Sequence, residues 1–181
     1  MSTWRHTAEI PHPVARAFSF LLESLPALLV DIETMQRARW ESAPPSLGDG
    51  TGLFVAWLQR PADPWLRSLT AEDLQLRFAV EREDHRLHVE VSGSHGTAEG
   101  VLEVQPAEEW CRLVVAGRLE LALDDPERFP PFLVEASQVD MEKRILSEIG
   151  ASTLRLARAV GRRLDMETRE PDEQAPPSED A

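Results

Sequence analysis

The feature that most constrains the fold of this chain is a long amphipathic segment at residues 131–164. Its apolar residues recur at helical spacing, and its charged residues fall largely between them. Acidic side chains come early and arginines late, which suits the helix macrodipole, and Pro131 is acceptable in a first turn. We therefore expect one helix of roughly 50 Å, which needs a β-sheet as its apolar partner. The apolar positions are Val139, Ile145, Leu146, Ile149, Leu156, Ala157, Val160 and Leu164.

The beginning of the chain predicts a strand followed by helix. Residues 2–10 alternate between apolar and polar side chains, which is typical of a β-strand. Pro11 and Pro13 end this strand because proline cannot donate to a β-ladder. From Val14 the apolar spacing becomes helical, and we expect Pro26 to divide this region into two short helices.

The middle of the chain predicts an antiparallel sheet. We expect strands at residues 33–40 and 53–58, followed by four alternating strands between residues 74 and 123. The turns between these last four strands are short. Consecutive strands with short connections indicate a meander with one buried face.

The order of these elements resembles that of the START and Bet v 1-like superfamily, which includes polyketide cyclase/dehydrase-like and lipid-transfer proteins. The stretch EIPHPVARAFSFLLE is similar to the family's first strand, proline turn and first helix, and PSLGDGTGLFVAW is similar to its glycine-rich entry into the sheet. The resemblance covers residues 2–164. It implies an α+β helix-grip fold, a curved antiparallel sheet wrapped around the long helix, with a cavity that often holds a hydrophobic ligand. We expect residues 1–164 to form this domain.

Small residues on the predicted inner faces agree with a cavity. Gly100, Gly117 and Ala98 stand where a filled core would carry larger aliphatic side chains, and Gly93 and Cys111 are similar. Gly150 lies inside the long helix and predicts a bend or a close approach. Inward glycines also serve strongly curved sheets, so the alternative of a filled core stays open. The predicted cavity wall consists of Trp4, His6, Phe78, Val89, Leu102, Leu113, Val115, Ile149 and Leu156.

The loop at residues 60–73 carries Trp65, Leu66 and Leu69 and is longer than a hairpin requires. Exposed apolar side chains beside a cavity predict a lid or a partner surface. The alternative is that the three side chains cap the core or are buried in a dimer.

Three functional hypotheses follow. The first is a carrier that buries a hydrophobic or amphipathic small molecule. The second is a cyclase- or dehydratase-like enzyme, which needs converging titratable groups, and only His6, Asp31 and Glu33 are candidates. The third is a ligand-free protein-interaction module that uses the 60–73 loop or the acidic tail. We favour the first hypothesis and name no catalytic residue.

Charge and composition restrict the partners. The net charge of −13 argues against nucleic acid, and the 181 residues contain neither a membrane-length apolar run nor a signal-peptide pattern. We expect a cytoplasmic monomer or homodimer. Residues 165–181 are acidic, contain proline and lack a hydrophobic period, so we expect a disordered tail. The single cysteine, Cys111, and the scattered histidines predict neither a metal site nor a cofactor.

Overall fold

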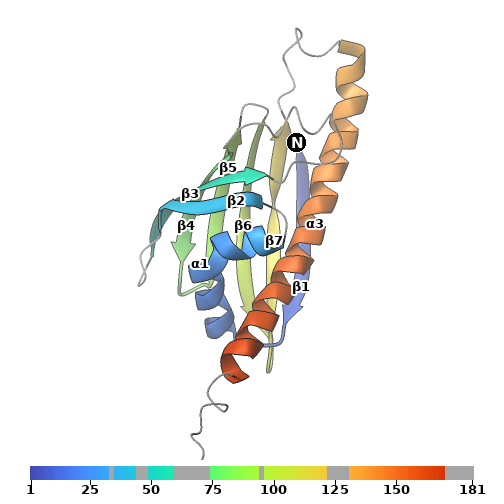
Figure 1. The fold of residues 1–181 in the computed structure, drawn as a ribbon. Helices are drawn as coiled ribbons and strands as arrows, with labels where there is room; N and C mark the ends of the chain where they lie inside the picture. The colour runs from blue at the N-terminus through green and yellow to red at the C-terminus, as the bar shows by residue number, and fades with distance from the viewer. Residues whose placement is uncertain (33–34, 44–48, 59–73, 94–95, 122–130, 170–181) are drawn as a thin grey trace, which may run out of the picture.

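The computed structural model describes residues 1–32, 35–43, 49–58, 74–93, 96–121 and 131–169. The described residues form one antiparallel sheet and two helices, as Figure 1 shows. The elements in chain order are β1 (Ser2–Ile10), α1 (Val14–Asp31), β2 (Met35–Ser42), β3 (Gly50–Leu58), β4 (Leu74–Glu81), β5 (Arg86–Gly93), β6 (Gly96–Pro106), β7 (Cys111–Leu121) and α3 (Pro131–Arg169).

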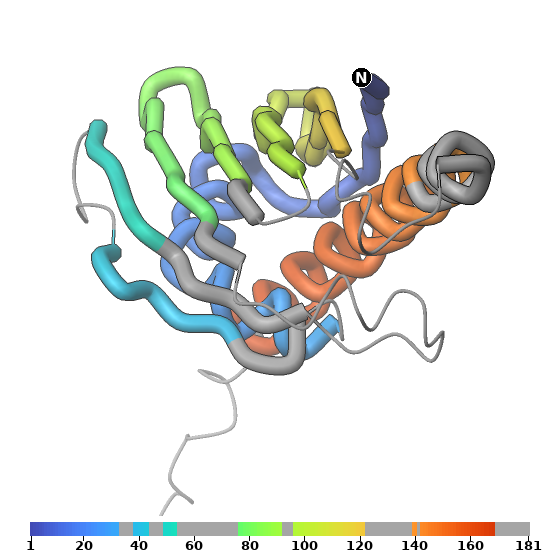
Figure 2. Tube along the Cα trace, turned by 90° about the horizontal axis from the view of Figure 1, so that it is seen from above, coloured from blue at the N-terminus to red at the C-terminus, as the bar shows by residue number. Residues whose placement is uncertain are grey.

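The seven strands lie in the order β1-β7-β6-β5-β4-β3-β2. Strands β2 to β7 form the expected meander, and β1 joins its far edge beside β7. Seen from above in Figure 2, the sheet curves around α1 and α3. The predicted helix-grip fold is therefore confirmed.

The first helix differs from the prediction, because α1 is continuous through Pro26. Proline removes one backbone hydrogen bond from a helix interior, and a break is expected there for that reason. The apolar stripe of α1 is buried on both sides of the proline, at Leu22 and Leu25 before it and at Leu28 after it. Burial of this stripe against the sheet and α3 holds the two halves as a single helix.

The long helix α3 runs beside β1 in the same direction. The ring of His6 lies against Gly150, and the ring of Pro11 lies against Gly161. From His6 to Pro11 the strand advances five residues at ~3.3 Å each, and from Gly150 to Gly161 the helix advances eleven residues at ~1.5 Å each. Both distances are roughly 16 Å, so the same faces of the two elements remain in contact along this length. The helix ends at Arg169, beyond the Leu164 that the sequence suggested, and residues 170–181 of the expected tail lie outside the described residues.

The main core lies where α1 and the C-terminal half of α3 meet the inner face of the sheet. Alternation along each strand places the apolar residues on this face, and helical spacing gives each helix one apolar stripe. His12 ties the corner after β1 to α3, since its Nε2 lies 3.2 Å from the Gly161 carbonyl oxygen and 3.1 Å from Asp165 Oδ1. The buried helix residues include Ala17, Phe18, Leu21, Leu22, Leu25 and Leu28 of α1, and Leu156, Ala157, Val160 and Leu164 of α3.

Candidate ligand-binding site

The inner face of the sheet has two ends that differ in burial. At one end, here called the Ile10 end, the side chains are at most 6% exposed. At the other, the Trp4 end, most side chains are only partly buried, and Leu119, which pairs with Ala98, is an exception at 6% exposed. The Ile10 end comprises Ala8, Ile10, Val104, Cys111 and Leu113. The Trp4 end comprises Trp4, His6, Val89, Val91, Ala98, Gly100, Val115 and Gly117.

Trp4 lies over two glycines of the neighbouring strands. It pairs with Gly117 of β7, which in turn pairs with Gly100 of β6. A Cβ at Gly117 would come within 2.6 Å of the Trp4 ring, and one at Gly100 within 3.5 Å. The inward glycines that suggested empty space therefore make room, at least in part, for the indole. Its Nε1–H is buried and has no hydrogen-bond partner among the described residues.

His6 occupies the space that Gly150 leaves on α3. A Cβ at Gly150 would lie 2.8 Å from Cε1 and 3.0 Å from Nδ1 of the imidazole. The close approach expected at this glycine is thus found, and it lets the helix pass over an aromatic ring. Like Trp4 Nε1, the Nε2 atom of His6 is buried without a hydrogen-bond partner in the described part of the chain. Two polar nitrogens from alternate residues of one strand are left unsatisfied, which is unusual for buried groups.

The structure divides the predicted wall residues between two environments. Phe78, Leu102, Leu113 and Leu156 are buried and belong to the core cluster. Trp4, His6, Val89, Val115 and Ile149 are partly buried, and the first four of these share the Trp4 end. The proposed lid residues Trp65, Leu66 and Leu69 lie outside the described residues.

The groups considered for catalysis are not brought together in the described part of the chain. Asp31 lies at the end of α1, where its Oδ2 accepts a hydrogen bond from Arg163 at 2.6 Å, and Glu33 is not described. Cys111 is fully buried, and this burial raises the pKa of its thiol to about 11, so it stays a neutral core residue. Among the described residues, no three His, Cys, Asp or Glu side chains gather as metal ligands would.

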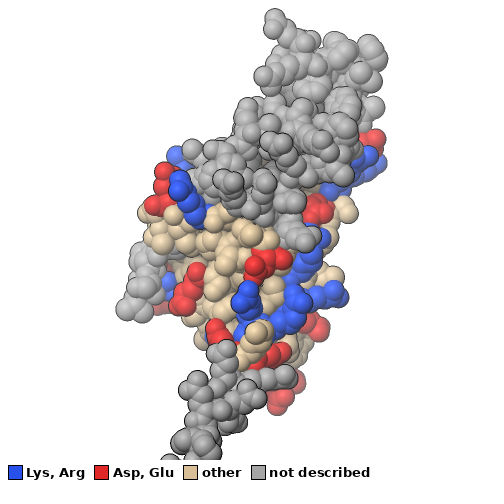
Figure 3. Space-filling model, viewed as in Figure 1, with Lys and Arg blue, Asp and Glu red and all other residues tan. Residues whose placement is uncertain are grey.

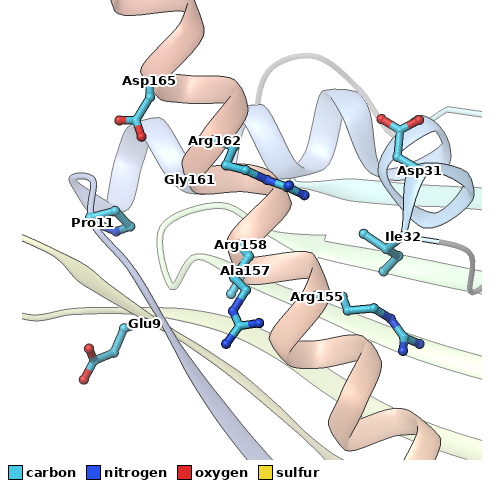
Figure 4. A pocket seen from close by; sticks show the side chains of 10 residues that line it. All are labelled: Glu9, Pro11, Asp31, Ile32, Arg155, Ala157, Arg158, Gly161, Arg162 and Asp165. Atoms are coloured by element: carbon cyan, nitrogen blue, oxygen red, sulfur yellow. The ribbon is translucent and has the colours of Figure 1, made fainter.

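A groove of about 530 Å³ runs along α3 between the end of α1 and β1, and the sequence pattern did not predict it. Figure 4 shows its lining, with Glu9 from β1 on one side, Asp31 and Ile32 from the end of α1 on the other, and α3 between them. The helix contributes three arginines, Arg155, Arg158 and Arg162. Figure 3 shows Lys and Arg side chains gathered along this part of α3.

The arginines of this groove differ in their partners. Arg155 pairs with Glu148, although its Nε–H is buried without an acceptor among the described residues. Arg158 and Arg162 have no ion-pair or hydrogen-bond partner within the same part of the chain. The signal is present in the sequence, because positions 155, 158 and 162 fall on one helical face. The macrodipole accounts for arginines late in a helix, but it does not account for the face that these three share.

Comparison with known proteins gives structural matches only. No family model matches the sequence, and no curated protein matches it. An aromatase/cyclase, Zhui, from Streptomyces sp. R1128 has a TM-score of 0.64 at 11% identity, over 90% of this chain and 95% of that one. The protein TTHA0849 of Thermus thermophilus has a TM-score of 0.62 at 16% identity, over 88% of this chain and 97% of that one. The chain therefore shares the START and Bet v 1-like fold with these two solved structures.

A third solved structure has the same fold. Norcoclaurine synthase from Thalictrum flavum has a TM-score of 0.58 at 13% identity and covers 92% of this chain and 87% of its own. At such low identity these likenesses establish the helix-grip fold and leave the site to be argued from the residues. No described helix combines the length and the apolar character that a membrane crossing requires.

Proposed function

We propose that this protein binds a hydrophobic or amphipathic small molecule between α3 and the Trp4 end of the inner face. The observation that carries the proposal is the combination of partly buried apolar side chains with two unsatisfied buried nitrogens. Val89, Val91 and Val115 offer the apolar wall, and Trp4 Nε1 and His6 Nε2 offer hydrogen bonds. Ligand hydroxyl groups at the two rings would accept from Trp4 Nε1–H and would donate to or accept from His6 Nε2 according to its tautomer. Either nitrogen left without a partner destabilises the fold by about 1–3 kcal/mol.

The fold supports the same proposal by analogy. An aromatase/cyclase and norcoclaurine synthase share this architecture, and both names describe proteins that act on small organic molecules. Binding by burial contributes ~25 cal/mol per Å² of apolar area, so a mostly enclosed ligand gains several kcal/mol. The unsatisfied nitrogens would then select for a ligand with a polar end.

The test is native mass spectrometry of the purified protein, followed by denaturing extraction of anything carried along. We expect a discrete small-molecule adduct that is lost on denaturation. A protein without adduct, whose melting temperature also stays constant with a panel of lipids and aromatic polyketides, would contradict the proposal.

A pair of matched variants ties the adduct to this site. Val89→Trp places a large ring at the Trp4 end, whereas Val101→Trp places the same ring on the outer face of the adjacent strand β6. We expect the first variant to lose the adduct and the second to keep it, with both folded by circular dichroism. An adduct that survives in Val89→Trp would place the ligand elsewhere.

The segment that carries Trp65, Leu66 and Leu69 remains our candidate for a lid over this site. The support is its sequence alone, which combines an indole and two leucines with Pro61 and Pro64. A change of Trp65 fluorescence on ligand addition, lost in Trp65→Phe, is the outcome that supports a lid.

A further inference from the structure

The groove beside α3 holds guanidinium groups that no described residue neutralises. Arg158 and Arg162 are four residues apart on one helix, so they occupy neighbouring positions on its surface. Their guanidiniums point in different directions in Figure 4, and both side chains are exposed, so they are free to swing toward a shared anion. Like charges at this spacing destabilise a helix, and an anion held between the two guanidiniums would remove the repulsion.

The other charged residues of the groove show how much of the positive charge of Arg158 and Arg162 is left unpaired. Asp31 is engaged by Arg163, and Asp165 lies 3.1 Å from His12 Nε2. That nitrogen faces two acceptors, Asp165 Oδ1 and the Gly161 carbonyl oxygen, and we therefore assign its hydrogen there. Glu9 is the one lining carboxylate for which no partner is found among the described residues. The unpartnered charges are thus two guanidiniums against one carboxylate.

A further observation points to a missing acceptor. The Nε–H of Arg155 is buried and has no described partner, although its Nη2 donates to Glu148 and to Ser152 Oγ. Guanidinium groups present planar, forked donors that match carboxylate and phosphate oxygens in a bidentate way. The groove also has the size of a small-molecule site, at about 530 Å³.

We propose that the α3 groove binds a single oxyanion group, a phosphate or carboxylate, of a small molecule through Arg158 and Arg162, with Arg155 beside them. The site is independent of the one proposed at the Trp4 end, because the two share no lining residue. Glu9 at its edge disfavours a second negative group, so the site selects one oxyanion over a polyanion. The ligand class is a small acid or monophosphate.

The experiment uses the full chain with inorganic phosphate and, separately, acetate as probes at constant ionic strength. We follow the Nε–H signals of the arginines by NMR. The expected result is a saturable shift of the Arg155, Arg158 and Arg162 signals in the millimolar range. Saturation by phosphate alone identifies a phosphate site, saturation by acetate alone identifies a carboxylate site, and saturation by both identifies a general oxyanion site.

Matched double variants separate a site from general attraction. R158Q/R162Q removes two charges from the groove, and R5Q/R77Q removes two from exposed outward positions of β1 and β4. We expect at least ~10-fold weaker binding in the first and a change below ~2-fold in the second. Glu9→Gln should strengthen binding by a few fold. Absence of saturation, or equal weakening in both double variants, would overturn the proposal.

Discussion

The two ends of the inner face lie on the same strands but pack α3 against the sheet in different ways. At the Ile10 end, aliphatic side chains and Cys111 meet the apolar stripes of α1 and α3. At the Trp4 end, two rings from β1 rest on glycines, and each keeps a buried nitrogen without a partner among the described residues. The first arrangement stabilises the fold, while the second leaves polar groups that a ligand can satisfy.

The largest expected effect tests this contrast with one substitution at each end. Ile10→Ala removes a fully buried side chain and should lower the free energy of unfolding by about 2–5 kcal/mol. Val115→Ala removes the partly buried aliphatic side chain of a residue at the Trp4 end, and we expect a loss of about 1 kcal/mol. Urea unfolding of both variants measures the difference. Equal losses would show that the two ends are packed alike.

The next effect is a pH dependence at the Ile10 end. Burial raises the pKa of Cys111 from 9.0 to about 11, so the folded protein retains a proton that the unfolded chain releases. Stability from this group is complete below about pH 9 and is lost as the pH rises towards about 11, by up to about 2–3 kcal/mol. Unfolding at pH ~7 and at pH ~10.5 should show this fall in the natural protein.

Cys111→Ala serves as the control for that measurement. The variant is expected to be less stable at both pH values because it leaves a small cavity. The further fall in its free energy of unfolding between pH ~7 and pH ~10.5 should be smaller than that of the natural protein. An identical fall in both would assign the pH dependence to other groups.

The smallest effect concerns the contact between α3 and His6. Gly150→Ala would gain up to ~1 kcal/mol of helix propensity, but its Cβ would meet the imidazole at 2.8 Å. We expect a net loss of about 1 kcal/mol, because the ring or the helix must shift. In a His6→Ala background the same change should become stabilising. A double-mutant cycle by thermal unfolding measures this coupling, and additive effects would contradict the close packing.

Much of the fold could be predicted from the sequence because its signals are local. Alternation predicts the strands of the meander, and helical spacing predicts α1 and most of α3. The continuity of α1 through Pro26 could not be predicted, since it depends on burial against elements distant in the chain. The end of α3 at Arg169 was missed because residues 165–169 have no apolar period, although Arg16 reaches from α1 to the Leu164 carbonyl oxygen and Thr168 Oγ1.

The candidate sites were less predictable, because they too depend on contacts between elements that are distant in the chain. Trp4 and His6 could be placed on the inner face, but only the register of β1 with β7 and the path of α3 show that glycines receive their rings. The groove combines residues of β1 and α1 with residues of α3 that lie far away in the sequence. The arginine spacing is visible in the sequence, and the lack of partners among described residues is not.

The most direct test of the account is methyl NMR of the protein under xenon, a neutral apolar probe that has no reason to bind the arginine groove. We predict saturable shifts for the methyl groups of Val89, Val91 and Val115 at the Trp4 end. The signals of the methyl groups of Ile10, Val104 and Leu113 should stay in place. Shifts confined to the Ile10 end, or spread evenly over both ends, would contradict the claim that a ligand space lies at the Trp4 end.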